Sequence, residues 1–263
     1  MGRIAETFVR LRAQQRGALM PYLMVGYPDK DSLQTLAPAL QAAGADLFEI
    51  GVPFSDPLAD GATIQRASEQ ALRNGVNVQY ALDSVHQLRQ IGVTVPLVMM
   101  GYYNPFLQYG VTRFAQAAAA AGADGVIVPD LPPEAAGEMQ QALSAVGLDL
   151  IMFVAPTTPD VRIKQITAVA SGFIYCVSLT GVTGARTTLW DGLPDFLARV
   201  RTHTELPLVV GFGISTTEHV KTVAQVADGA IVASAIINML DAHAPETRVA
   251  TVVEYIKTLR TVI

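Results

Sequence analysis

The sequence is poor in the residues on which many extracellular and cofactor-dependent proteins rely. It contains one cysteine, Cys176, in 263 residues, so no internal disulfide, Cys-x-x-Cys pair or cysteine-based zinc site can form. Charged residues make up only 16%, the net charge is -5, and no basic run could follow a phosphate backbone. No apolar run is long enough to span a bilayer, and the charged N-terminus does not resemble a secretory signal. We therefore expect a cytoplasmic protein that binds neither nucleic acid nor membrane.

Lysine and histidine are also scarce, which limits the chemistry available. All of them fall in stretches with helical periodicity or at helix starts: Lys30, Lys164, Lys221, Lys257, His86, His203, His219 and His243. This distribution leaves no lysine for a Schiff base at the end of a strand and no histidine cluster for a catalytic metal. We expect carboxylate acid–base chemistry without a metal or a cofactor in this chain.

Short apolar runs rich in Val, Ile and Leu recur eight times along the chain. Each has the length of a strand buried on both faces, and stretches with helical periodicity separate them. The runs cover residues 18–26, 46–51, 95–102, 124–130, 149–156, 172–178, 206–213 and 228–234. Three of them open with the related phrases AGADLFEIG, AGADGVIVPD and VADGAIVAS, in which an aspartate leads into the strand. This internal similarity is typical of a repeated βα unit.

Eight βα units in one chain of this length predict the α/β class and a closed (β/α)8 TIM barrel. We expect a single TIM-barrel domain over residues 1–263, with an extra helix before the first strand and another at 249–260. A doubly wound open sheet is the alternative. That fold usually carries G-x-G-x-x-G after its first strand, and MVGYPDKDS lacks this motif.

Glu49 interrupts the second apolar run, LFEIG. Active sites of TIM barrels gather at the C-terminal ends of the strands, so Glu49, Asp60, Asp130 and Tyr175 become candidates. Apolar surroundings raise a carboxyl pKa by disfavouring the charged form, which lets one group accept and donate protons near neutral pH. The alternative is a structural glutamate satisfied by a tyrosine hydroxyl or a backbone amide.

Asp60 ends the proline-interrupted segment VPFSDPLAD, which follows the strand that contains Glu49. An aspartate directly before a helix is commonly its N-cap, and Asp56 before Pro57 is a typical turn residue, so both have a structural alternative. The segment leaves the Glu49 strand, however, and its far end can fold back across the barrel mouth. We expect Glu49 and Asp60 to form the catalytic pair.

A phosphate site is expected in the loops after the last two strands. TIM barrels often bind phosphate there through backbone N–H groups and a short helix N-terminus. Gly211 and Gly213 permit close approach of a ligand, Ser234 can donate a hydroxyl, and Gly184 can add further amides. Turns need glycine in any case, so the glycines alone also fit an ordinary loop.

Two further groups of residues are expected to contact a ligand. The polar loop at 180–192 is typical of a lid, with Thr183 and Arg186 as its contact residues, although a surface loop without a role is the alternative. Met100 and Ile127 lie near strand ends and line an apolar pocket if they face the mouth. Core packing is the default for both.

Five stretches closely resemble the tryptophan synthase alpha chain family. They are LFEIGVPFSDPLADGATIQ, GYYNPFLQYG, GADGVIVPDLPPEA, YCVSLTGVTGAR and VVGFGIST, and they are spread over nearly the full chain. The first is close to diagnostic, whereas GFGIS is modest support by itself. The resemblance implies a lyase of tryptophan biosynthesis that converts indole-3-glycerol phosphate to indole and glyceraldehyde 3-phosphate.

The resemblance also implies roles for particular residues. Glu49 would be the principal acid–base group, Asp60 would hydrogen-bond the indole nitrogen, and Tyr175 would lie beside Glu49. Ala233 stands where relatives often have glycine, so the chain departs from the family at that corner. The implied phosphate contacts are Gly184, Gly213, Ile214 and Ser234.

The family further implies a partner, a beta chain that holds pyridoxal phosphate and consumes indole delivered through a tunnel. An alpha2-beta2 assembly is expected, with the segment 53–60 and the region of Asn104 facing the beta chain. Pyridoxal phosphate is implied for the partner only. A retro-aldol cleavage of this kind needs neither a Schiff base nor a metal, because the indole ring itself holds the electrons.

Other functions stay open at this point. A stand-alone indole-3-glycerol phosphate lyase would share these motifs and release free indole. An inactive phosphate-ligand-binding barrel could regulate a partner, although two acids in an apolar mouth speak against a decayed site. A barrel isomerase acting on sugar phosphates would turn over substrates that lack indole.

Overall fold

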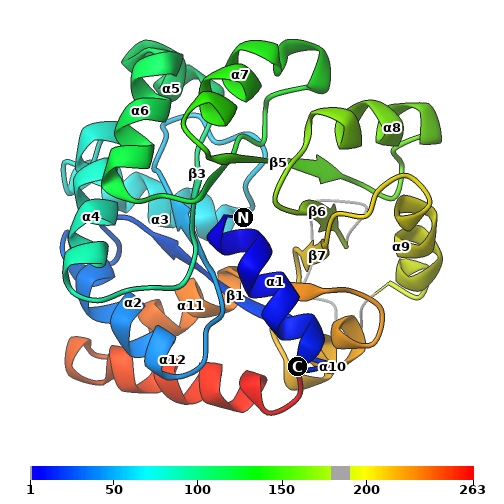
Figure 1. Ribbon diagram of the computed structural model, residues 1–263. Coiled ribbons are helices and arrows are strands. Elements are labelled where there is room, and N and C mark those ends of the chain that lie inside the picture. Colours follow the sequence, from blue (N-terminus) through cyan, green and yellow to red (C-terminus); the bar gives the residue numbers. More distant parts are fainter. Residues whose placement is uncertain (1, 179–189) are drawn as a thin grey trace.

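The computed structural model describes residues 2–178 and 190–263, in which the strands form a closed parallel barrel (Figure 1). Each strand pairs with the next along the chain, and β8 closes against β1. The strands are β1 (Ala18–Met24), β2 (Phe48–Gly51), β3 (Leu97–Met100), β4 (Gly125–Ile127), β5 (Asp149–Val154), β6 (Ile174–Val177), β7 (Leu208–Gly211) and β8 (Gly229–Val232). The predicted eight-stranded TIM barrel is confirmed.

Helices surround the barrel and cover its strands (Figure 1). They are α1 (Arg3–Ala13), α2 (Ser32–Ala42), α3 (Ala62–Arg73), α4 (Val78–Gln90), α5 (Tyr103–Tyr109), α6 (Val111–Ala121), η1 (Pro133–Ala135), α7 (Gly137–Ala145), α8 (Asp160–Val169), α9 (Leu193–Arg201), α10 (Thr217–Ala224), α11 (Ser234–Ala242) and α12 (Pro245–Arg260). The extra helices expected at the two ends of the chain are α1 and α12. Among the described residues, no helix is both long enough and apolar enough to cross a membrane.

The paired strands are shorter than the apolar runs that predicted them. The run 124–130, for example, contributes only Gly125–Ile127 to the sheet, although Val128 is still buried. Pro129 has no amide hydrogen to donate to a neighbouring strand, so pairing ends before it. The ends of the runs thus become the first residues of the loops at the barrel mouth.

The aspartates of the repeated phrase hold the other end of the barrel, where the strands begin. Asp46, Asp124 and Asp228 each accept a hydrogen bond from a backbone amide of a neighbouring strand. The amides are, in the same order, those of Leu19, Leu97 and Leu208. Each aspartate also forms an ion pair with an arginine of α1, in the same order Arg10, Arg3 and Arg12.

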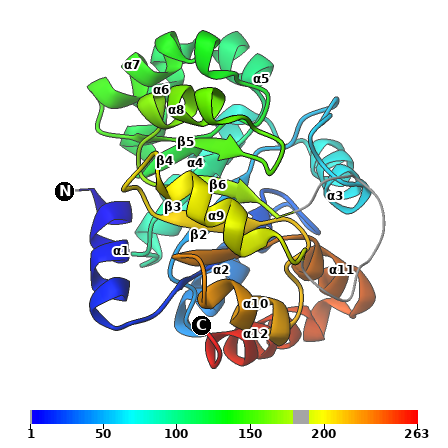
Figure 2. The ribbon, with the colours of Figure 1, turned by 90° about the vertical axis from the view of Figure 1, so that its right-hand side faces the viewer.

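Helix α1 therefore closes the N-terminal end of the barrel. Its inward face is apolar and buried, with Ile4, Phe8 and Leu11 packed against the core. Figure 2 shows α1 across one end of the barrel, while α3 and α11 lie toward the opposite end. A ligand site is accordingly expected at the open C-terminal end of the strands, as in other TIM barrels.

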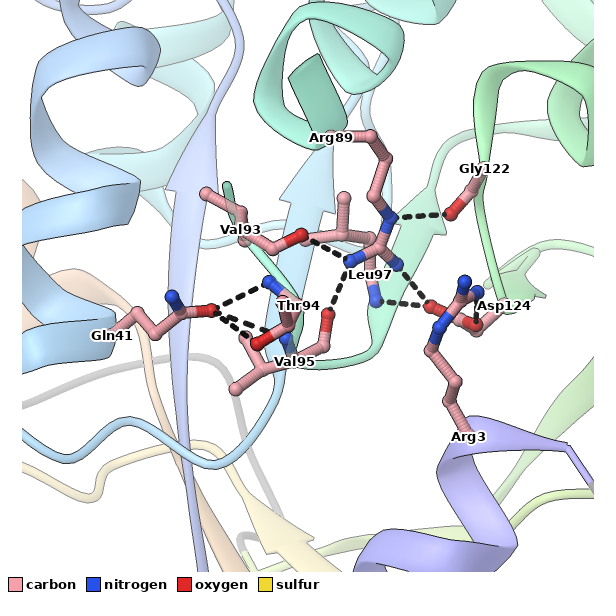
Figure 3. A network of polar contacts seen from close by, with 9 residues as sticks. All are labelled: Arg3, Gln41, Arg89, Val93, Thr94, Val95, Leu97, Gly122 and Asp124. Atoms are coloured by element: carbon pink, nitrogen blue, oxygen red, sulfur yellow. Dashed lines mark hydrogen bonds and ion pairs between the residues drawn. The ribbon is translucent and has the colours of Figure 1, made fainter. Parts of the chain in front are cut away.

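Asp124 is the centre of the most extensive of these polar networks (Figure 3). Its Oδ2 accepts hydrogen bonds from the Leu97 amide at 2.8 Å and from Arg89 Nη2 at 2.6 Å, and its Oδ1 accepts one from Arg3 Nη1 at 2.9 Å. Arg89 in turn donates to the carbonyls of Val93 and Val95, in the loop between α4 and β3, and of Gly122, after α6. The network ties α1, α4, β3 and the start of β4 together.

Replacing Asp124 by alanine should lower the free energy of unfolding by about 3 kcal/mol, because it leaves the partly buried Arg89 guanidinium and the Leu97 amide without their acceptor. Urea denaturation followed by circular dichroism measures this loss. The matched control is Asp83→Ala, which removes an exposed α4 carboxylate bonded to Gln79 and should cost less than about 0.5 kcal/mol. Equal losses in the two variants would contradict the anchoring role.

Candidate active site

Glu49 projects from β2 into the barrel. It is only 1% exposed. Its charge acts on Tyr175 of β6, a strand across the barrel, which a side chain directed at the covering helices could not do. Its Oε2 atom is buried without a hydrogen-bond partner among the described residues. A purely structural glutamate would be expected to have a hydroxyl or amide donor at this oxygen, and none is found there.

The environments of Glu49 and Asp60 give the two carboxyl groups different pKa values. Burial, together with the smaller effect of the nearby charge of Asp60, raises the pKa of Glu49 to about 8. Burial also raises the pKa of Asp60 to about 6, while a hydrogen bond from the Tyr102 hydroxyl opposes this effect. Near neutral pH the favoured state of the pair therefore has Glu49 protonated and Asp60 ionised.

Asp60 lies in the loop between β2 and α3, and it is not the N-cap of α3. The cap position belongs to Gly61, and no side chain makes a capping hydrogen bond there. The Ala59 amide donates to the Tyr102 hydroxyl at 2.9 Å, which fixes the loop beside Tyr102 and leaves that hydroxyl free to donate to Asp60. The capping alternative for Asp60 is thus wrong, and its carboxylate is available at the mouth.

Two tyrosines place their hydroxyls in the barrel by the same geometry. A Cβ atom added to Gly211 would lie 2.2 Å from the Tyr175 Oη, and one added to Gly51 would lie 2.1 Å from the Tyr22 Oη. In both cases the glycine lies two residues beyond the register partner of the tyrosine on the next strand. Gly211 was expected to admit a ligand to its backbone, and in the structure its missing side chain makes room for Tyr175.

Apolar side chains line the barrel around these polar groups. Met100 of β3 is the register partner of Gly51 in β2, and Ile127 of β4 is the register partner of Met100. Both side chains therefore lie on the inner face of the sheet. They are 8% and 0% exposed. The Phe153 ring packs against that of Tyr175 with 4.4 Å between centroids. The site therefore combines an apolar, aromatic-lined interior with two carboxyl groups.

Those residues expected to contact phosphate that the structure describes lie at the ends of β7 and β8. Gly213 has φ +76°, a conformation that favours glycine, and it is exposed, whereas Ile214 is buried. Ser234 is the first residue of α11, whose N-terminus has no side-chain cap. Ala233 precedes it with φ -119° and ψ -80°.

Two groups of candidates remain. Thr183, Gly184 and Arg186 lie in 179–189, outside the described residues. Asp130 accepts a hydrogen bond from the Tyr103 amide at 2.9 Å and thus caps the start of α5. Cys176 is buried in the core. In the described part of the chain, no group of three or more His, Cys, Asp or Glu side chains is arranged to hold a metal ion.

Sequence reasoning missed two residues of the site, Tyr22 and Tyr102. Both stand in or directly after an apolar run that was predicted as a strand, so their position near a strand end was a usable signal. Pairing of β1 with β2 brings Tyr22 beside Glu49, and a contact between two loops brings Tyr102 to Asp60. The sequence shows neither contact. The closed barrel, the apolar mouth and the Glu49–Asp60 pair together define a class: TIM-barrel proteins with a carboxylate acid–base site at the C-terminal ends of the strands.

Comparison with known proteins narrows this class to one family. The family model of the tryptophan synthase alpha chain matches residues 8–262. The alpha chain of Roseiflexus castenholzii is 66% identical over 260 residues, covering 99% of this chain and 100% of the relative, and that of Chloroflexus aurantiacus is 60% identical, covering 98% and 97%. The crystal structure of tryptophan synthase subunit alpha from Legionella pneumophila superposes with a TM-score of 0.92 at 36% identity, covering 100% and 98%. The chain belongs to the tryptophan synthase alpha chain family.

Proposed function

We propose that this chain cleaves indole-3-glycerol phosphate to indole and glyceraldehyde 3-phosphate by a retro-aldol reaction. The observation that carries the proposal is a protonated Glu49, with a pKa of about 8, buried in an apolar barrel mouth beside the more acidic Asp60. An indole ring fits apolar and aromatic walls, and its nitrogen becomes positive during the reaction, where an ionised Asp60 would stabilise it.

In the proposed reaction Glu49 serves as acid and then as base. Its carboxylic proton passes to C3 of the indole ring, and the ring nitrogen takes the positive charge opposite Asp60. The resulting Glu49 carboxylate removes the proton of the hydroxyl on the glycerol carbon attached to C3. The bond between this carbon and C3 breaks, its electron pair returns to the indole ring, and Glu49 is protonated again. No step calls for a cofactor in this chain.

The remaining contacts of the proposed substrate combine residues placed by the structure with residues implied by the family resemblance. Tyr175, Met100 and Ile127 would surround the indole ring, and Thr183 would belong to the loop that closes over it. The phosphate would be bound by Gly184, Gly213, Ile214 and Ser234. Support comes from the uncapped N-terminus of α11, since free amides and the helix dipole favour an anion there.

We propose that the partner is a tryptophan synthase beta chain that contains pyridoxal phosphate and receives indole in an alpha2-beta2 assembly. Leu58, in the loop 53–60, is 91% exposed, and Leu107, on α5 close to Asn104, is 45% exposed. Large exposed apolar side chains near the mouth are what a protein interface would cover. Co-purification with a beta chain tests the assembly.

The decisive experiment for the activity is an assay of indole-3-glycerol phosphate cleavage on the purified chain, with and without a beta chain. Cleavage that rises strongly on adding the beta chain supports the proposal. High activity that a beta chain does not change would instead indicate a stand-alone lyase. Absence of cleavage under both conditions would refute the activity.

The pH dependence of cleavage should be bell-shaped. Glu49 must be protonated to deliver the first proton, so kcat/KM should fall as pH rises through about 8. Asp60 must be ionised to stabilise the cation, so kcat/KM should also fall as pH decreases through about 6. Initial rates between about pH 5 and pH 10 measure both limbs. A profile that keeps rising above the pKa of Glu49 would contradict its role as the first acid.

A further inference from the structure

Tyr22 lies next to Glu49 in the barrel wall. The two residues are register partners in β1 and β2, so their side chains leave the sheet on the same side. Both are nearly fully buried, at 4% and 1% exposure. A phenol and a carboxyl group therefore share one space from which water is largely excluded.

The Tyr22 ring extends along the strand direction toward the mouth. A Cβ atom on Gly51 would lie 2.1 Å from the Tyr22 Oη and 2.6 Å from its Cζ. Gly51 lies two residues beyond Glu49 and on the same face of β2. The hydroxyl thus occupies the space beside the Glu49 side chain on the mouth side, where the substrate would enter.

The hydrogen-bonding needs of these two groups are complementary. The Tyr22 hydroxyl contacts the Met24 sulfur at 3.8 Å, and a thioether is a weak acceptor. Glu49 Oε2 is buried with no hydrogen-bond partner in the described part of the chain. Leaving a buried carboxylate oxygen unpaired is costly once the group ionises. We propose that the Tyr22 hydroxyl is the hydrogen-bond donor that stabilises and positions the ionised Glu49 carboxylate.

The other groups that face Glu49 would act differently. Asp60 approaches from the loop after β2 and disfavours the charged form of Glu49. Tyr175 faces it from β6, and Tyr102 contacts Asp60. Burial raises the pKa values of Tyr22 and Tyr175 well above the ordinary tyrosine value, so both remain protonated donors. Tyr22 is the donor from the strand adjacent to Glu49.

This role deepens the proposed function and rests on it for its catalytic meaning. After Glu49 has given its proton to the indole ring, a bare carboxylate remains in apolar surroundings. A donor beside it stabilises that state until it takes the proton of the glycerol hydroxyl. Tyr22 is thus a positioning residue that acts through Glu49.

The test is Tyr22→Phe, which keeps the ring and removes only the hydroxyl. Loss of a donor to the charged form should raise the pKa of Glu49 by about half to one pH unit. Carbon-13 NMR of carboxyl-labelled glutamate follows the titration, and the Glu49 signal is the one that disappears in Glu49→Gln. The alkaline limb of kcat/KM should move in the same direction, and kcat should fall about tenfold.

Tyr80→Phe is the matched control. It removes a surface hydroxyl that donates to Asp31 and should change neither the Glu49 titration nor the pH profile. An unchanged or lowered Glu49 midpoint in Tyr22→Phe would overturn the proposal. The NMR titration needs no substrate, so it tests the Tyr22–Glu49 hydrogen bond independently of the reaction. If the Glu49 midpoint rises in Tyr22→Phe but the wild-type protein does not cleave indole-3-glycerol phosphate, the hydrogen bond is supported and only the proposed reaction is rejected.

Discussion

Replacing Glu49 by glutamine should lower kcat for indole-3-glycerol phosphate cleavage by about 10³-fold or more. Glutamine has the same shape but can neither deliver a proton to the indole ring nor take one from the glycerol hydroxyl, so both proton transfers fail together. Substrate binding should survive, because the apolar walls and the expected phosphate contacts are untouched. Steady-state assays give kcat, and calorimetric titration of the inactive variant with the substrate gives the binding constant.

The folded state provides an internal check on this variant. The pKa of Glu49 is raised to about 8 in the folded protein. As pH rises from the ordinary glutamate pKa of the unfolded chain to this folded-state pKa, the carboxyl therefore lowers the free energy of unfolding progressively. Glu49→Gln removes this effect, so the variant should be at least as stable as the wild type at alkaline pH. Glu69→Gln, which changes an exposed glutamate on α3 paired with Arg73, is the control and should retain full activity. Wild-type rates in folded Glu49→Gln would refute the assignment of the acid.

Replacing Asp60 by asparagine should lower kcat/KM by about 10²-fold or more, because the developing positive charge on the indole nitrogen loses its counter-charge. The amide keeps the size of the side chain and can still accept a hydrogen bond from Tyr102. The acid limb of the pH profile, expected near the Asp60 pKa of about 6, should disappear as well. Rates measured across the acid range test both effects in one experiment.

Asp56→Asn is the matched control for Asp60. Asp56 lies in the same loop, but it is exposed and its carboxylate is bonded to the Ser55 hydroxyl at 2.5 Å. Measured on the isolated chain, without a beta chain, this variant should cleave the substrate at the wild-type rate. If the acid limb persists unchanged in Asp60→Asn, the ionisation that controls it belongs to another group.

The chain order of the fold could be predicted because its signal is local. Each strand is a continuous apolar run and each helix has its own periodicity, so counting them predicted the barrel and its terminal helices before any contact was known. The run boundaries were less accurate. Residues such as Val128 are as buried as strand residues without being paired, and apolar character reports burial rather than pairing.

The composition of the site could be predicted only in part. A carboxylate in an apolar run marked Glu49, and a place at the end of a predicted strand marked Tyr175. Asp60 was ambiguous, since an acid before a helix is as often a cap as a functional group, and only the position of Gly61 at the cap excluded that alternative. Asp130 was a candidate because of its place at a strand end, and in the structure its carboxylate accepts a hydrogen bond from the Tyr103 amide at the start of α5.

By itself, then, the sequence determined the barrel, the family and the presence of an acid in a buried strand. Only the tertiary structure decided which way Glu49 points, and it brought Tyr22 and Tyr102 to the two carboxyl groups. The physical reason is that a strand side chain can face either side of the sheet, and the choice depends on register with strands distant in the sequence. The proton affinity of Glu49 comes from that enclosure, which forms only when the barrel closes.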